Sequence, residues 1–101
     1  MSDLTGTTVW VTGAGTGIGR AVALAFAQAG ARVALTGRSI ETLNVTLDAV
    51  TAAGGEAMVA VADVTDPHAV TRAHEAVVAM FGPPAILINN AGANARRRHW
   101  A

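Results

Sequence analysis

The sequence predicts an α/β fold of three layers, αβα, in which a parallel sheet lies between helices. Segments typical of strands alternate with segments typical of helices, which gives about four strands and three helices. The strand segments are mostly continuous apolar runs, as expected where helices cover both faces of a parallel sheet. With 101 residues, the chain has room for only one half of a doubly wound domain and a little more. We therefore expect residues 1–101 to form the N-terminal part of a single domain.

The first half of the chain contains two predicted strands and two predicted helices. Residues 7–12 and 31–36 are apolar runs typical of strands. A glycine-rich turn follows the first strand and leads into a helix that ends near Gly30. Ser39 is placed to cap the second helix, which ends before Gly54. Apolar residues at helical spacing give each helix one apolar face: Ile18, Val22, Ala25, Phe26 and Ala29 in the first, and Leu43, Leu47 and Val50 in the second.

The second half contains the two remaining strands and one helix. Residues 56–62 and 85–89 are the third and fourth predicted strands. Between them, Asp66 is placed as a helix N-cap and Pro67 suits the first helical position. The apolar stripe of this helix precedes Gly82 and two prolines, and it consists of Val70, Ala73, Val77, Met80 and Phe81.

The composition excludes several classes of function. The chain has no cysteine, so disulfides and thiolate ligands are excluded and a reducing, cytoplasmic location is expected. It has no apolar run of transmembrane length and no signal-like start, so no membrane partner is expected. The three histidines lack ligand spacing, and no metal site is expected.

The charge distribution argues against nucleic acid as a partner. Three of the seven basic residues form one cluster, Arg96 to Arg98, and the rest of the chain is mildly acidic. The cluster is itself open to a nucleic-acid interpretation. We favour a loop and helix start that follow the fourth strand.

The turn after the first strand reads Thr12-Gly-Ala-Gly-Thr-Gly-Ile-Gly19. Where such a turn opens a helix, exposed backbone N–H groups and the positive end of the helix dipole suit a phosphate. A merely flexible turn is the alternative, and the strand before it and the helix after it argue against that reading. The spacing differs from G-x-G-x-x-G, and the absence of lysine excludes a Walker loop. The fold is thus predicted to be Rossmann-like, with a phosphate site formed by Gly13, Gly15, Thr16, Gly17, Ile18 and Gly19.

Three motifs together resemble the short-chain dehydrogenase/reductase family. They are Thr12-Gly13-x-x-x-Gly17-Ile18-Gly19, Asp63-Val64 and Asn89-Asn90-Ala91-Gly92, in this order and spacing. The resemblance covers the chain from its start to Gly92. It implies an NAD(P)-dependent oxidoreductase that moves hydride between a nicotinamide and a small carbonyl or alcohol substrate. It also implies a homo-oligomer for the full-length protein.

The resemblance assigns roles to the matched residues. It implies that residues 13–19 wrap the pyrophosphate and the adenosine ribose, and that Asp63 and Val64 contact the adenine. Asp63 as a mere turn former is the alternative, and we favour the adenine contact. The resemblance also implies that Asn90, Ala91 and Gly92 line the ribose, whereas Asn89 ties neighbouring backbone together.

The end of the second predicted strand distinguishes the two nicotinamide cofactors. An NAD site usually has a carboxylate there, which holds the ribose 2′-hydroxyl. This chain has Gly37 instead, followed by Arg38 and Ser39. Arg38 suits a 2′-phosphate, so NADP(H) is favoured over NAD(H). The alternative is that Arg38 is a solvated surface residue. A second basic residue just before Gly17 would strengthen the case for NADP(H), but Thr16 stands there.

No catalytic residue is assigned to this chain. The resemblance implies a catalytic Ser, Tyr and Lys, with Tyr as general acid, but the sequence has neither Tyr nor Lys. We therefore expect the 101 residues alone to be inactive. A fragment, a truncated gene product and a frameshifted reading all remain open. The alternative functions are a non-catalytic NADP(H)-binding protein or sensor and an unrelated Rossmann enzyme such as a methyltransferase.

Overall fold

A computed structural model describes residues 3–90, in which four parallel strands and three helices alternate and confirm the predicted α/β fold. Ala91, Gly92 and the arginine cluster lie outside the described residues. Within residues 3–90, no helix is long and apolar enough to cross a membrane. The elements are β1 (Thr8–Thr12), α1 (Gly17–Gln28), β2 (Arg32–Thr36), α2 (Ile40–Ala52), β3 (Glu56–Val59), α3 (Pro67–Phe81) and β4 (Ile86–Asn89).

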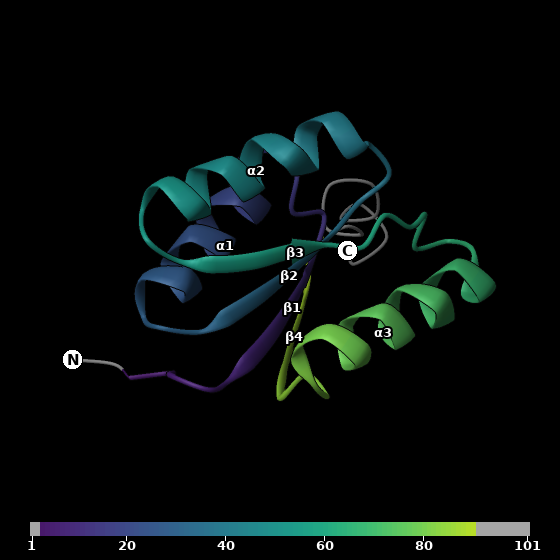
Figure 1. Cartoon of the computed structure of the whole chain (residues 1–101). Coiled ribbons are helices and arrows are strands. Elements are labelled where there is room, and N and C mark those ends of the chain that lie inside the picture. Colours follow the sequence, from purple (N-terminus) through teal and green to yellow (C-terminus); the bar gives the residue numbers. More distant parts are fainter. Residues whose placement is uncertain (1–2, 91–101) are drawn as a thin grey trace, which may run out of the picture.

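The strand order explains where a site can form. The order is β3-β2-β1-β4, so the chain runs outward from β1 to β3 and then returns to the other side of β1. Figure 1 shows α1 and α2 on one face of the sheet and α3 on the opposite face. The winding direction therefore reverses between β1 and β4. In open α/β sheets, ligands bind outside the carboxyl ends of the strands at such a reversal.

The core has two layers because side chains of β1 alternate between the faces of the sheet. Val9 and Val11 are fully buried on the face covered by α1 and α2. Trp10 points to the other face, where it packs with Ala73 and Val77 of α3. All five residues of β1 are buried, which explains why the strand has no polar face in the sequence.

The apolar face predicted for α1 is only partly correct. Ile18 is 69% exposed, and the buried residues of the helix are Gly19, Ala23 and Ala27. The helix packs so closely that small residues occupy its inner face, whereas spacing alone had favoured the larger ones. Met80 of α3 was likewise expected inside and is 66% exposed.

The third strand is shorter than predicted, because β3 ends at Val59. The chain beyond it still runs along β2. The N–H of Ala60 donates to the Leu35 carbonyl (2.9 Å) and that of Ala62 to the Gly37 carbonyl (3.0 Å). These bonds hold residues 60–62 beside the end of β2 and deliver Asp63 to the carboxyl edge of the sheet.

Candidate functional site

The predicted site residues within the described part of the chain lie at one edge of the sheet. The glycine turn follows β1, Arg38 and Ser39 follow β2, Asp63 and Val64 lie beyond β3, and Asn90 follows β4. Because all four strands are parallel, their carboxyl ends share this edge. The fold therefore gathers segments that are up to 77 residues apart in the sequence.

The glycine turn has backbone angles that favour glycine. Gly13 has φ +64° and Gly17 has φ +55°, both in the left-handed region. The carbonyl oxygen of Gly13 accepts a hydrogen bond from Asn90 Nδ2 at 3.2 Å. This bond ties the turn after β1 to the residue after β4, across the reversal in strand order.

Gly19 allows α1 to approach the end of β1. A Cβ added to Gly19 would collide with the carbonyl oxygen of Gly13, and it would lie 2.7 Å from the Gly13 carbonyl carbon and 2.9 Å from Asn90 Nδ2. The first contacts are with backbone, which cannot rotate away. The helix can begin at this point only because position 19 has no side chain.

The N-terminus of α1 differs from those of the other two helices. Its N-cap residue, Thr16, makes no side-chain cap hydrogen bond. By contrast, the Ser39 hydroxyl accepts from the Thr42 N–H in α2, and Asp66 accepts from two N–H groups in α3. The first N–H groups of a helix have no partner within it. Those of α1 are therefore available to an anion at the mouth of the turn.

Asp63 is the acceptor of a tight local turn. Its Oδ1 accepts from the Thr65 hydroxyl (2.7 Å) and from the Thr65 N–H (2.9 Å). These bonds hold the pKa of Asp63 below its ordinary value of 3.8, and the charge of Arg38 lowers it further as the smallest cause. The turn role of Asp63 is thus real, and the structure also brings Asp63 within electrostatic reach of Arg38.

We predict that Asp63 stays ionised across pH 5 to 8. A carboxyl with a depressed pKa stabilises the fold above the pKa of the unfolded chain and loses this contribution as the pH falls through its folded value. The contribution of Asp63 to stability should therefore be fully present above about pH 4 and be lost as the pH falls below that value. An NMR titration of the carboxyl carbon tests this.

The matched variants are Thr65→Val and Thr71→Val. Thr65→Val removes the largest cause of the shift and should move the pKa of Asp63 back toward 3.8. Thr71 is exposed on α3 and donates to the Pro67 carbonyl, so Thr71→Val should leave the pKa unchanged. A wild-type pKa at or above 3.8 would show that the Thr65 bonds do not form.

The two asparagines differ from the expected division of roles. Asn90 makes the tie to neighbouring backbone, at the Gly13 carbonyl, whereas Asn89 Oδ1 accepts from the Thr12 hydroxyl at 2.9 Å. The alternation of β4 explains the difference. Asn89 shares a face of the strand with Leu87, so it points to the α3 side, and the next residue points toward the turn.

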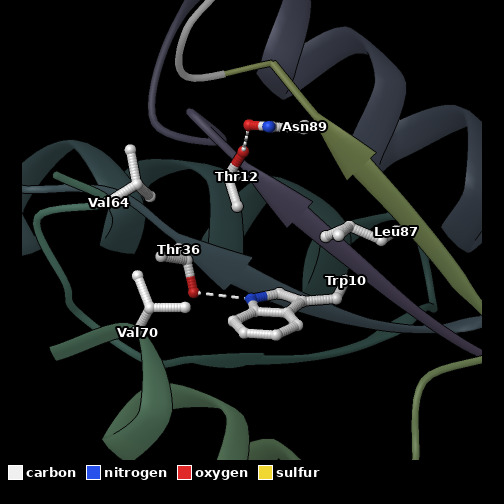
Figure 2. A pocket seen from close by; sticks show the side chains of 7 residues that line it. All are labelled: Trp10, Thr12, Thr36, Val64, Val70, Leu87 and Asn89. Carbon is white, nitrogen blue, oxygen red and sulfur yellow. Dashed lines mark hydrogen bonds between the residues drawn. The ribbon is translucent and has the colours of Figure 1, made fainter. Parts of the chain in front are cut away.

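A cavity of about 160 Å³ opens on the α3 side of this edge. In Figure 2, Val64 and Val70 lie on one side of it and Leu87 on the other, with Trp10 between them. The indole N–H of Trp10 donates to the Thr36 hydroxyl (2.8 Å), and that hydroxyl donates to the Ala60 carbonyl (2.8 Å). The polar atoms of this wall are therefore satisfied within the protein. The lining residues are Trp10, Thr12, Thr36, Val64, Val70, Leu87 and Asn89.

Sequence reasoning missed the cavity wall and two residues beneath the turn. His74 was expected to be solvated, and it is exposed, but its ring lies 5.5 Å from the Trp10 ring between centroids. Under the turn, Arg20 Nε donates to Thr46 Oγ1 at 2.9 Å. A threonine within the apolar stripe of the second helix was the available signal, because a buried hydroxyl needs a partner.

Comparison with protein families matches nearly the whole chain to one family. Residues 7–100 match the family model described as short chain dehydrogenase. A protein of Mycobacterium tuberculosis named "Probable oxidoreductase EphD" is 46% identical over 86 residues, which are 85% of this chain and 14% of that protein. Hydroxysteroid dehydrogenase-like protein 2 of Bos taurus is 37% identical over 97 residues, which are 89% of this chain and 23% of that protein.

Solved structures share the fold of the described residues. A metagenomic short-chain oxidoreductase in complex with NADP superimposes with a TM-score of 0.85 and is 41% identical, covering 90% of this chain and 41% of that one. A hydroxysteroid dehydrogenase from Escherichia coli gives a TM-score of 0.86 at 33% identity, covering 89% and 38%. The chain thus spans less than a third of the two curated relatives above, and less than half of these two solved structures.

Proposed function

The chain belongs to the short-chain dehydrogenase/reductase family, an oxidoreductase family that uses NAD(P) and acts on small molecules, and from this premise we propose that it binds NADP(H) as the cofactor-binding part of such an enzyme. The reaction we propose for the whole protein is hydride transfer between the nicotinamide and a carbonyl or alcohol. When bound, the nicotinamide supplies or accepts the hydride.

The observation that carries this proposal is the uncapped N-terminus of α1 at the reversal between β1 and β4. Its N–H groups and the positive end of the helix dipole suit a diphosphate. Gly13 and Gly17 give the turn its shape, and Gly19 brings the helix close to the strand. The diphosphate would thus be held by residues 13–19 without any charged side chain in direct contact.

The remaining groups at this edge suit the adenosine end of the dinucleotide. Asp63 uses only Oδ1 for its turn, so Oδ2 is the oxygen that we propose accepts from the adenine amino group. Val64 offers an apolar wall at the cavity. We place the ribose beside Asn90, with Ala91 and Gly92 following it in the sequence.

We predict that Arg38→Ala removes a preference for NADP(H). No carboxylate stands at position 37, and Arg38 is exposed at the end of β2, where it can pair with a 2′-phosphate. A charge-assisted hydrogen bond of this kind changes affinity about ten- to a hundredfold. The affinity for NADPH should fall by this factor, and that for NADH should stay within about twofold. Titration calorimetry of both cofactors measures the change.

The control for Arg38→Ala is Arg72→Ala. Arg72 is an exposed arginine on α3, so its loss changes the net charge equally without touching the end of β2. It should alter neither dissociation constant. Equal NADPH and NADH affinities in the wild-type protein, unchanged by Arg38→Ala, would overturn the cofactor assignment and return Arg38 to a solvated surface role.

A second candidate is a protein that binds NADP(H) without catalysing a reaction. It uses the same uncapped N-terminus of α1 to hold the diphosphate and needs no catalytic side chain. The two functions differ in a stopped-flow measurement on the whole protein with NADPH and a panel of small carbonyl compounds. Loss of NADPH absorbance indicates an oxidoreductase, whereas stoichiometric binding with no loss indicates a sensor.

A further inference from the structure

A polar clamp lies beneath the glycine turn and is formed by Arg20 of α1 and Thr46 of α2. Arg20 Nε donates to Thr46 Oγ1 at 2.9 Å, and its Nη2 donates to the carbonyl oxygen of Gly15. Thr46 is fully buried, and its hydroxyl donates to the carbonyl oxygen of Ala14 at 2.8 Å. The clamp therefore holds two successive carbonyl groups of the turn on the side that faces α2.

Because peptide bonds are planar and trans, the clamp also sets the direction of N–H groups in the turn. In a trans peptide, the carbonyl and the N–H of the next residue point in opposite directions. With the Ala14 carbonyl drawn to Thr46, the N–H of Gly15 points away from α2. With the Gly15 carbonyl drawn to Arg20, the N–H of Thr16 also points away. The clamp thus sets the direction of the two N–H groups that precede the uncapped helix.

The packing around the clamp leaves little freedom for the turn. A Cβ added to Gly15 would collide with the Thr42 hydroxyl and lie 3.0 Å from the Thr42 Cβ, so α2 contacts the turn directly. Within residues 3–90, no carboxylate pairs with Arg20, which is half-buried. Its guanidinium group therefore binds a carbonyl group of the turn instead of a carboxylate.

We propose that Arg20 and Thr46 are positioning residues for the diphosphate, and this inference rests on the proposed function. They contact no ligand themselves. They fix the carbonyl groups of Ala14 and Gly15 against α2, and the N–H groups behind them face the ligand before it arrives. Such preorganisation raises affinity because the ligand does not have to order the turn.

The test measures the dissociation constants of NADPH and of adenosine 2′-phosphate, which has no diphosphate, on the full chain and its variants. Thr46→Val removes the clamp hydroxyl and keeps the charge of Arg20. We expect it to weaken NADPH binding about tenfold or more, and adenosine 2′-phosphate binding by less than about twofold. Thr46→Ser keeps the hydroxyl and should bind both ligands as the wild type does.

Arg20→Lys separates geometry from charge. Lysine keeps the charge but lacks the planar fork that reaches two acceptors, so it should weaken NADPH binding as much as Arg20→Gln does. Full recovery in Arg20→Lys would overturn the clamp in favour of simple attraction, and so would wild-type NADPH affinity in Thr46→Val. Equal weakening of both ligands would also overturn it, because a general loss of structure produces that result. If the wild-type chain bound no dinucleotide, the proposed function itself would fail.

Discussion

Replacing Gly19 with alanine is expected to lower the free energy of unfolding by about 3 kcal/mol, the upper range for an added methyl group in a tightly packed place. The new Cβ would collide with the backbone carbonyl of Gly13 and reach within 2.9 Å of Asn90 Nδ2. Relief requires either that α1 move away from β1 or that the Gly13 carbonyl and the Asn90 amide, which are bonded to each other, be displaced. Urea denaturation of wild type and variant measures the change.

The control for Gly19→Ala is Ala25→Ser on the same helix. Ala25 is exposed, and a small polar residue there changes only helix propensity, so its effect should stay below about 0.5 kcal/mol. Gly19→Ala with wild-type stability would mean that α1 can shift along the sheet at no cost. The close approach would then have no part in holding the turn.

Replacing Gly17 with valine is expected to weaken dinucleotide binding about a hundredfold, the equivalent of losing one or two charge-assisted hydrogen bonds. Gly17 has φ +55°, and a β-branched residue is a genuine outlier there. No atom lies within 4 Å of an added Cβ, so the folding cost comes from the backbone angle and is about 1–2 kcal/mol. The valine side chain would stand on the open side of the turn, where we place the diphosphate.

Gly54→Val is a matched control for Gly17→Val. Gly54 also has a positive φ, +85°, with no atom within 4 Å of an added Cβ. It lies between α2 and β3, at the opposite end of the sheet from the turn. This variant should lose a similar amount of stability and bind NADPH as tightly as the wild type. If Gly17→Val also kept its affinity, the diphosphate site would be misplaced.

The elements of the fold were predictable because their signals are local. Ser39 and Asp66 cap the helices that they were expected to cap, and Pro67 begins α3. The face of α1 was not predictable from spacing. Ile18 and Ala25 belong to the predicted apolar stripe and are exposed, and Phe26 is only partly buried, whereas the small residues at 19, 23 and 27 are buried. The spacing of apolar residues predicts that a helix forms, but the distance between the helix and the sheet decides which of its faces is buried.

The candidate site was predictable as a set of segments and not as a set of bonds. A parallel sheet brings the ends of its strands to one edge, so motifs at those ends gather there. Which asparagine reaches the turn depends on the register of β4, and the backbone tie expected of Asn89 is made by Asn90. The Arg20 and Thr46 clamp joins side chains 26 residues apart on two helices, and no local pattern predicts it.

The bond between Asn90 and Gly13 has a consequence for how the protein folds. Its partners are 77 residues apart, and the contact closes only when β4 docks beside β1. Contacts of such high sequence separation form slowly, since the intervening chain must lose its freedom first. Ligand competence should therefore appear late, in step with the global folding transition. An excised peptide of β1, the turn and α1 would carry the whole glycine motif and still lack the anchor that shapes it.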